Sequence, residues 1–257
     1  MHLYQEFPPH PPLAGLVACL WSSHAVPGGA PLRHRVLPDN CIDILWQDRA
    51  PAGFVAGMMS RPHRVEVLEP VLTVAVRFLP GAARAFFDVP LHALQDGHPC
   101  LSELWPRAEA EALAAALWER EQTLAQRLAT IERALLARLQ RHATDRGERL
   151  VRAAVGLIER SGGALRVEAL AHALGVSRQH LALQFRERVG LNAKTFAMVC
   201  RFRRASSALR GAQGAAVDWA GLAGECGYYD QSHLIHEFRQ FAGETPQAFA
   251  LGRVPAP

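Results

Sequence analysis

An internal repeat near the C-terminus limits the possible folds of this chain more than any other feature. Four apolar or glycine positions recur 53 residues later, as Leu181, Phe185, Gly190 and Phe196 in the first copy and Leu234, Phe238, Gly243 and Phe249 in the second. A glycine upstream recurs after 52 residues, as Gly175 and Gly227, so one residue is inserted before the second helix of the second copy. Self-similarity at a fixed offset predicts two copies of one supersecondary unit.

Each copy has the pattern of a helix-turn-helix unit. An alanine stands four residues before each glycine, at Ala171 and Ala223. The small alanine lets two helices cross closely, and the glycine accepts the left-handed backbone of the turn. Ser177 and Asp230 follow where the second helices need N-caps. One such pattern is common in helical proteins, whereas two matched copies are specific for tandem units.

The segment between the two units, residues 192–209, is predicted to be one helix. Its inward residues are Met198, Phe202, Ala205 and Leu209, and its outward basic residues are Arg201, Arg204 and Arg210. At 1.5 Å per residue this helix is about 27 Å long. That length can hold two recognition helices about one DNA turn, roughly 34 Å, apart on one face of a duplex.

The first 143 residues follow two other patterns. Up to residue 78, short alternating runs broken by proline and glycine predict strands at residues 17–21, 33–37, 42–46, 54–57 and 71–78. Residues 109–142 contain no glycine or proline, and their apolar spacing predicts two helices broken near Glu121. We therefore expect a strand-rich α+β domain, with a barrel-like fold as one option, at residues 1–105 and a helical pair at 106–143. An all-α domain of seven helices with two helix-turn-helix motifs is expected at 148–257.

Composition excludes several classes of protein. The 257 residues are 49% hydrophobic and 20% charged, as in ordinary globular domains. The sequence has no apolar run of about 20 residues and begins without the basic and apolar regions of a signal peptide, so we expect a soluble cytoplasmic protein without a membrane partner. The five cysteines are odd in number and form no C-x-x-C pair, which argues against a disulfide framework and a structural zinc site.

The positive charge lies in the C-terminal part. Residues 148–257 hold 14 basic and 9 acidic side chains, a net charge of +5, whereas the first 147 residues hold 14 and 15, a net charge of −1. All but one of the 28 basic residues are arginines, and Lys194 is the exception. A GC-rich genome explains most of this bias, but arginine also suits bidentate contacts with phosphate and guanine.

The last 100 residues resemble the AraC/XylS family of bacterial transcription regulators. The resemblance lies in residues 170–178 and Phe185 of the first copy, and in residues 223–234, 238–239 and 243–249 of the second. The second group is similar to the signature of the family. Thr245 and Pro246 within it also have a local role, an N-cap followed by proline at the first helical position.

The resemblance implies that the second helix of each unit enters the major groove of double-stranded DNA. The implied contact residues are Ser177, Arg178, Gln179, Ala182 and Leu183 in the first copy, Asp230, Gln231, Ser232, Ile235, His236 and Arg239 in the second, and Arg201 and Arg204 between them. Glutamine can bind adenine, arginine can bind guanine, and apolar side chains can contact the thymine methyl group. Ala182 and Leu183 depart from the polar readers often found in the family. For every position the alternative is an ordinary exposed residue.

The N-terminal part is similar to uncharacterised sensor domains joined to one branch of this family, through residues 37–43, 76–81 and 101–105. Better-known relatives have a sugar-binding jelly roll followed by two dimerising helices. Candidate residues for binding a small-molecule effector are Trp21, His34, Arg35, Asp43, Trp46 and Arg77. A carboxylate inside an apolar strand needs a partner, so Asp43 is expected to pair with Arg77 or Arg35. An internal ion pair and a buried aromatic core are the structural alternatives.

The expected function is transcription regulation under the control of a small molecule or a partner, with RNA polymerase as a candidate partner. A nucleoid or adaptor protein that binds DNA without ligand control is the alternative, and a DNA-repair or metal-dependent enzyme is a weaker one. His233 and His236 share a helix face without a third metal ligand nearby, and only Cys19 and Cys41 lie where repair enzymes of the family have four cysteines. We therefore expect no catalytic site, metal or cofactor, and a structural role for Cys226.

The second helix of the predicted pair carries one apolar stripe, formed by Leu124, Leu128, Ile131, Leu135 and Leu139. A helix can bury such a stripe against its own domain or against a second copy of the chain. Charged residues flank the stripe, and two-fold dimers commonly read bacterial operators, so we expect a homodimer through this helix.

Overall fold

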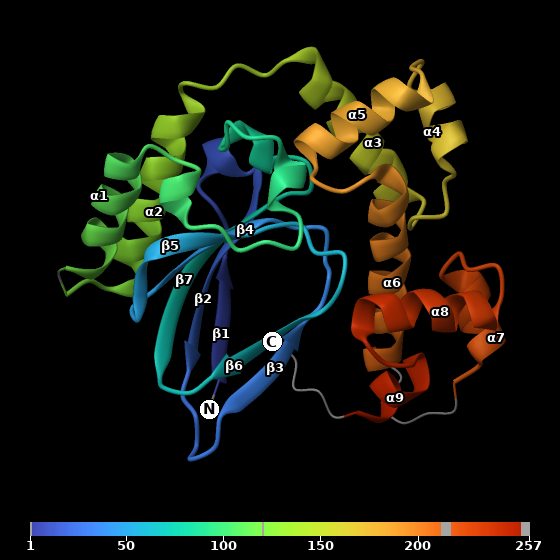
Figure 1. Cartoon of the computed structure of the whole chain (residues 1–257), viewed down its shortest axis with the longest axis horizontal. Helices are drawn as coiled ribbons and strands as arrows, with labels where there is room; N and C mark the ends of the chain where they lie inside the picture. Colours follow the sequence, from blue (N-terminus) through green and yellow to red (C-terminus); the bar gives the residue numbers. More distant parts are fainter. Residues whose placement is uncertain (1, 120, 212–216, 253–257) are drawn as a thin grey trace.

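The computed structural model describes residues 2–119, 121–211 and 217–252 of the chain. The N-terminal half is strand-rich and the C-terminal half is helical, which confirms the predicted fold class (Figure 1). The strands are β1 (His2–Phe7), β2 (Val17–Ala25), β3 (Leu32–Val36), β4 (Asp43–Gln47), β5 (Ala50–Ala56), β6 (His63–Val67) and β7 (Val71–Phe78). Five of them form an antiparallel sheet in the order β1-β2-β7-β4-β5, and β3 pairs with β6 in a separate two-stranded sheet.

Five strands coincide with the alternating runs of the sequence, whereas the pattern does not predict β1 and β6. Both of these strands are rich in polar side chains. β1 is an edge strand of the large sheet, and β6 pairs only with β3 among the described strands. A strand at a sheet margin needs no regular apolar face, so it lacks the alternation that marks a half-buried strand.

Two helices cover one face of the large sheet, α1 (Arg107–Trp118) and α2 (Leu124–Leu139), which are the two helices predicted with a break near Glu121 (Figure 1). Alternate residues of β4 and β7 point to these helices and are fully buried, namely Ile44, Trp46, Val74, Val76 and Phe78. Four short 3-10 helices complete this half of the molecule: η1 (Pro11–Leu13), η2 (Ala83–Ala85), η3 (Leu91–Leu94) and η4 (Leu101–Glu103). The period of two along the strands thus supplies one continuous apolar layer.

The apolar stripe of α2 belongs to this layer. Leu128, Ile131 and Leu135 are buried, and Leu124 and Leu139 are half-buried against the same core. The stripe is therefore buried within its own chain, the alternative that the sequence leaves open, and a homodimer stays a prediction. The physical reason for this burial is that α2 packs against β7 of its own chain, and this contact already removes the stripe from water.

The C-terminal half consists of seven helices, as predicted, in the ranges that the structure describes. They are α3 (Arg146–Arg160), α4 (Val167–Ala173), α5 (Arg178–Arg188), α6 (Ala193–Gly211), α7 (Trp219–Glu225), α8 (Gln231–Ala242) and α9 (Pro246–Leu251). The pairs α4–α5 and α7–α8 are the two repeat copies, and α6 is the predicted connecting helix. Within the described ranges, no helix combines the length and the apolar character that crossing a bilayer requires.

The turns and caps of the two units follow the sequence pattern. Gly175 and Gly227 have φ angles of 65° and 81°, the left-handed backbone expected at these turns. The Ser177 hydroxyl accepts a hydrogen bond at 3.1 Å from the third amide of α5, and the Asp230 carboxylate accepts one at 2.7 Å from the third amide of α8. Thr245 caps α9 in the same way. The helix starts are therefore encoded locally.

The apolar core is continuous across residues 143–148. One cluster runs from the sheet through α1 and α2 into α3, α4, α5 and the first half of α6, whereas a second cluster joins the rest of α6 to α7, α8 and α9. Gly81, which follows β7, packs so closely on α3 that an added Cβ would lie 3.3 Å from a methyl group of Val151. The first helix-turn-helix unit therefore packs on the N-terminal half, and the second unit has a core of its own. The predicted division into residues 1–105, 106–143 and 148–257 stays a prediction.

Candidate nucleic-acid interface

The first recognition helix, α5, is held by its apolar side and free on its polar side. Leu181 and Phe185 are fully buried, and the ring of Phe185 meets that of Phe196 on α6 edge to face. The predicted contact positions of this copy are all exposed, namely Ser177, Arg178, Gln179, Ala182 and Leu183. Leu183 keeps 53% of its surface in solvent.

The second recognition helix, α8, has the same division. Leu234, Phe238 and Phe241 are fully buried and pack with Phe202 of α6. The predicted contact residues Asp230, Gln231, Ser232, His236 and Arg239 are exposed, and Ile235 is half-buried. The early turns of both helices therefore present side chains to the outside, as the resemblance implies.

The two N-cap residues have a defined task within the protein. The Asp230 carboxylate and the Ser177 hydroxyl each accept a hydrogen bond from their own helix. A carboxylate at this place repels phosphate, while the free amides of a helix N-terminus attract it. We interpret both residues as fixing the start of the helix, with any DNA contact there made by neighbouring groups.

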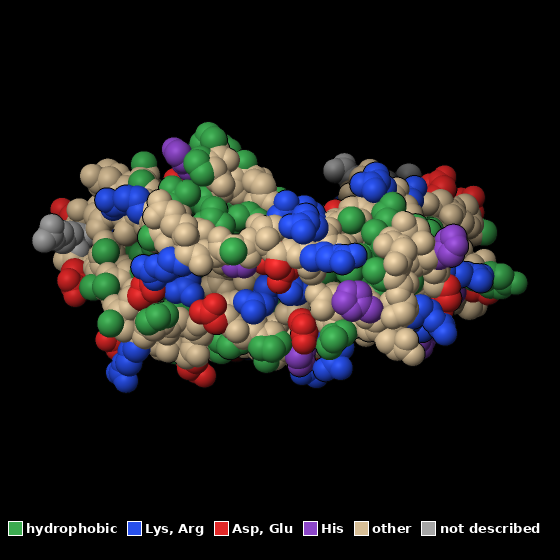
Figure 2. All heavy atoms as spheres, turned by 90° about the horizontal axis from the view of Figure 1, so that it is seen from above, with side chains coloured by type: hydrophobic (Ala, Val, Ile, Leu, Met, Phe, Trp, Pro, Cys, Tyr) green, Lys and Arg blue, Asp and Glu red, His purple; other side chains and the backbone are tan. Residues whose placement is uncertain are grey.

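The basic side chains around these helices differ in their availability. Arg178 forms an exposed ion pair with Glu168 of α4, with 3.3 Å between Nη1 and Oε1. Arg204 on α6 and Arg239 on α8 are exposed. Figure 2, which views the molecule from above, shows basic side chains over both halves of that face, several of them on the half formed by the C-terminal helices. Exposed pairs such as Arg178–Glu168 contribute little to stability, so Arg178 can leave its partner for another anion.

The prediction that Arg201 lies on the outside of the connecting helix is wrong. Its side chain is only 13% exposed and forms an ion pair with the buried carboxylate of Glu237 on α8, with 2.7 Å between Nη2 and Oε1. Its Nη1 also donates to the carbonyl of Gly163, at 2.6 Å. Helical periodicity places a residue on a face of a helix but does not tell which neighbour covers that face.

One candidate residue was not predicted from the sequence. Tyr229 is 93% exposed and stands directly before the N-cap of α8. It is the residue inserted in the second repeat copy relative to the first. The inserted residue in the second copy is therefore the sequence signal for Tyr229, because an extra residue before a helix changes which side chain is exposed at the start of that helix.

Three of the six N-terminal candidates, Trp21, Asp43 and Arg77, form one buried polar cluster, on the face of the sheet opposite to α1 and α2. Asp43 accepts hydrogen bonds from Nε and Nη2 of Arg77, each at 3.1 Å, and from the indole nitrogen of Trp21, also at 3.1 Å. Burial raises the pKa of Asp43 to about 6, against the opposite pull of Arg77. Of the two expected partners of Asp43, Arg77 is confirmed. The carboxylates of Asp39 and Glu6 also lie within 4.0 Å of Arg77.

The other candidates for effector binding do not join this cluster. Trp46 is fully buried on the opposite face of the sheet, within the main core. His34 of β3 stacks on His2, with 6.0 Å between the ring centroids. Arg35, the alternative partner of Asp43, pairs instead with Glu244, which lies between α8 and α9. The six residues therefore occupy four different environments in the fold.

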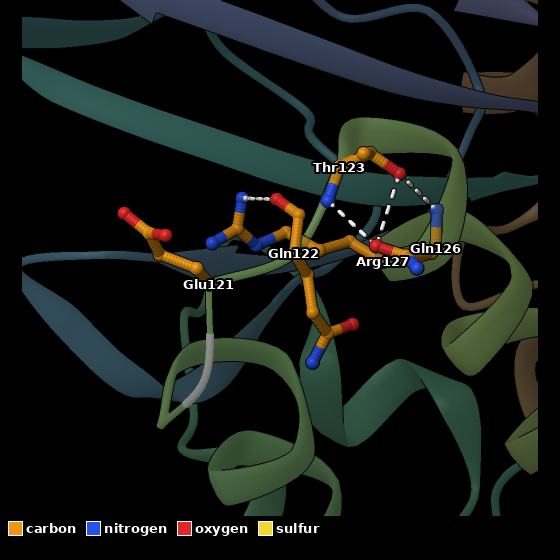
Figure 3. A pocket seen from close by; sticks show the side chains of 5 residues that line it. All are labelled: Glu121, Gln122, Thr123, Gln126 and Arg127. Carbon is orange, nitrogen blue, oxygen red and sulfur yellow. Dashed lines mark hydrogen bonds between the residues drawn. The ribbon is translucent and has the colours of Figure 1, made fainter.

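Two surface hollows lie away from these candidates. The first, of about 420 Å³, lies between α1 and α2 and is lined by Glu121, Gln122, Thr123, Gln126 and Arg127 (Figure 3). There Arg127 donates to the backbone carbonyls of Leu117 and Gln122, and Gln126 belongs to the cap of α2. The second hollow, of about 230 Å³, lies between α6 and α7. Among the described residues no group of three histidine, cysteine or acidic side chains is placed to hold a metal ion.

In comparisons with known proteins, the N-terminal and C-terminal halves of the chain match two different family models. Residues 170–251 match a family model described as a helix-turn-helix domain, and residues 5–99 match one described as a domain of unknown function (DUF6597). No curated protein matches the chain.

Several solved structures are similar to the chain. The C-terminal domain of AraT, a response regulator from Geobacillus stearothermophilus, is 21% identical, covering 44% of this chain and 92% of its own, with a TM-score of 0.39. ToxT from Vibrio cholerae is 10% identical, covering 86% of this chain and 97% of its own, with a TM-score of 0.46. A transcriptional regulator with an AraC-type DNA-binding domain from Chromobacterium violaceum is 22% identical, covering 43% and 96%, with a TM-score of 0.37.

The assignment rests on the repeat, on the two turn glycines with their caps, and on the sequence match of residues 170–251. The chain carries a C-terminal helix-turn-helix domain, joined to an N-terminal domain that matches a family described as a domain of unknown function.

Proposed function

We propose that this chain is a sequence-specific regulator of transcription that inserts α5 and α8 into two successive major-groove segments of double-stranded DNA. The observation that carries the proposal is the pair of matched helix-turn-helix units, each with an exposed polar face at the start of its second helix. In helix-turn-helix proteins the N-terminal residues of the second helix contact base edges. Such a protein works in the bacterial cytoplasm, where the chromosome is.

The exposed residues divide by the contacts that their chemistry allows. Gln179 and Gln231 can each bind adenine through two hydrogen bonds, and Arg178 can bind guanine once it leaves Glu168. Ala182, Leu183 and Ile235 offer apolar contacts with the thymine methyl group, while Ser232 and His236 can donate or accept one hydrogen bond. Arg204, Arg239 and the phenol of Tyr229 are suited to phosphate oxygens, which position the protein without reading sequence.

We further propose that the N-terminal half controls how α8 is presented relative to α5. The first unit shares the core of that half, whereas the second unit touches it through a few polar and apolar contacts. Arg35 contacts Glu244 and the carbonyl of Ala242, and Leu37 packs against the second core. The amide of Asn40 donates to the Phe196 carbonyl of α6 at 3.0 Å.

These contacts give a physical route for regulation. A small molecule or a partner protein, RNA polymerase included, that binds the two arrangements with different affinity shifts the equilibrium between them. Arg35 lies on β3, residues 37–42 connect β3 to β4, and β4 begins with Asp43 of the buried polar cluster. The cluster and the contacts with the second unit are therefore close along the chain, so a structural change at the cluster can reach those contacts.

The test is selection of DNA sites from a random pool by the full-length protein, followed by affinity measurements at fixed salt. We expect a selected site that is bound at least about a thousandfold more tightly than random DNA. Equal affinity for all sequences would contradict specific regulation and would favour the alternative of a nucleoid or adaptor protein.

A further inference from the structure

We propose that Arg201 is a positioning residue, which holds the start of the second recognition helix without touching DNA. The inference rests on the proposed reading of DNA by α8. It starts from a continuous chain of polar contacts that links Arg201, Glu237, His233 and Tyr229. This chain runs from the middle of α6 to the entrance of α8.

The guanidinium of Arg201 is fully engaged inside the protein. Its Nε and Nη2 donate to the two carboxylate oxygens of Glu237, at 3.3 and 2.7 Å, and its Nη1 donates to the Gly163 carbonyl. The Tyr228 ring lies 5.7 Å from the guanidinium carbon. Glu237 has only 4% of its side chain exposed, so the arginine supplies the charge that this buried carboxylate needs. If Arg201 turned outward to contact phosphate, the buried carboxylate of Glu237 would lose its neutralising charge.

The other end of the chain fixes the first turn of α8. His233 Nε2 lies 2.9 Å from Glu237 Oε1, and His233 Nδ1 accepts a hydrogen bond at 3.2 Å from the Tyr229 amide. Because Nδ1 accepts a hydrogen bond, the proton of the neutral ring must be on Nε2. Nε2 then donates to Glu237. The Asp230 carboxylate accepts from the His233 amide in return. Side chain and backbone thus cap the helix reciprocally, as in a capping box moved by one residue.

The same arginine also ties α8 to the turn between α3 and the first unit. Gly163 ends the turn after α3, with a φ of 82°, and an added Cβ would lie 2.1 Å from the Ala197 carbonyl of α6. Only a glycine allows this close approach of turn and helix. Arg201 therefore joins three elements, the turn after α3, the connecting helix α6 and the recognition helix α8. The angle between the two recognition helices depends on all three.

The first repeat copy is built differently at the matching positions. His180 and Gln184 correspond to His233 and Glu237 by the offset of 53 residues. His180 is exposed, and Gln184 accepts a hydrogen bond from Arg188 of its own helix. The first unit is fixed by the core that it shares with the N-terminal half. The second unit lacks that shared core, and the polar chain from Arg201 supplies the corresponding constraint.

The test compares Arg201→Gln with Arg204→Gln in the full-length protein. Arg204 lies three residues further along the same helix and is exposed, so it is the matched control. Affinity is measured from 50 to 200 mM salt for the selected site and for a site with the second segment scrambled. For Arg201→Gln we expect about a tenfold loss on the selected site, loss of discrimination at the second segment, and an unchanged salt slope. For Arg204→Gln we expect weaker binding to both sites and a slope reduced by about 0.9.

Two further variants test whether the effect of Arg201→Gln comes from loss of the ion pair with Glu237. Glu237→Gln removes only a buried charge that DNA cannot reach, and it should reproduce the loss of discrimination at constant slope. Arg201→Lys should restore part of the discrimination, because it retains the positive charge beside Glu237. A reduced salt slope with intact discrimination in Arg201→Gln would overturn the proposal, and so would normal discrimination in Glu237→Gln.

A measurement without DNA separates this inference from the proposed function. In Arg201→Gln we expect the amide of Tyr229, which donates to His233, to exchange its hydrogen at least about tenfold faster than in the wild type. Unchanged exchange at Tyr229 and in the first turn of α8 would overturn the positioning role. Faster exchange in a protein that shows no sequence preference would support the positioning role and contradict the proposed function alone.

Discussion

Arg35 of β3 and Glu244, which follows α8, form an ion pair with 2.9 Å between Nη2 and Oε1, and 25% of each side chain is exposed. Arg35 also donates to the carbonyl of Ala242, the last residue of α8. More than 200 residues separate the two partners in the sequence. The pair joins the N-terminal half to the end of the second recognition helix, on a unit that is otherwise packed around its own core.

This pair should contribute measurably to the docking of the second unit. In a double-mutant cycle with Arg35→Gln and Glu244→Gln, we expect a coupling energy of about 0.5–1 kcal/mol, since partial exposure weakens the ion pair. The free energy of unfolding from urea denaturation provides the measurement. Strictly additive effects of the two substitutions would mean that the pair does not hold the halves together.

A glycine at the other contact between the halves allows a sharper test. Gly190 has a φ of 98°, and an added Cβ would lie 2.9 Å from the Leu91 carbonyl of η3. Gly175 has a φ of 65° with no atom within 4 Å of such a Cβ, so it serves as the control. We expect Gly175→Ala to cost about 1–2 kcal/mol through backbone strain alone. Gly190→Ala should cost more, because strain and overpacking add. Equal losses would show that the first unit does not pack on the N-terminal half as described.

The buried pair of Asp43 and Arg77 predicts a pH dependence. In Arg77→Met the carboxylate loses its partner, and we expect a loss of about 3 kcal/mol at pH 7. Burial holds the pKa of Asp43 above that of the unfolded chain, at about 6 in the wild type, and loss of the arginine raises it further. A group with a raised pKa in the folded state stabilises the fold at low pH and loses this effect as the pH rises.

The deficit of Arg77→Met relative to the wild type should therefore shrink between pH 7 and pH 4.5. The double variant Asp43→Asn/Arg77→Met removes both charges of the pair and should show a smaller deficit than Arg77→Met at pH 7. Urea denaturation at both pH values gives the comparison. A deficit of Arg77→Met that grows toward acid would contradict this interpretation of the cluster.

The sequence could predict the helix-turn-helix units because their determinants are local. The glycines, caps and buried leucines of each unit lie within about 20 residues, and the same pattern occurs in both copies of the repeat. The burial of the α2 stripe and of Arg201 depends on partners far along the chain, β7 and Glu237, which helical periodicity does not identify. The same limit explains why Asp43 had two possible partners. Only the pairing of β4 with β7 places Arg77 opposite it.

Base readout should be divided between the two recognition helices. Gln179→Ala should relax discrimination at one segment of the selected site, and Gln231→Ala should relax it at the other, each by about 1–3 kcal/mol. Competition with sites substituted one base pair at a time gives the position of each effect. Loss at the same base pairs in both variants would contradict the assignment of one helix to each segment.

The central claim is that one chain reads two major-groove segments, and footprinting of the full-length protein on its selected site tests it most directly. Guanine and adenine protection in the major groove should appear in two segments about 10 bp apart on one face of the duplex. Gln231→Ala should weaken one of the two segments and leave the other in place. Protection of a single segment by the wild-type protein would contradict the account.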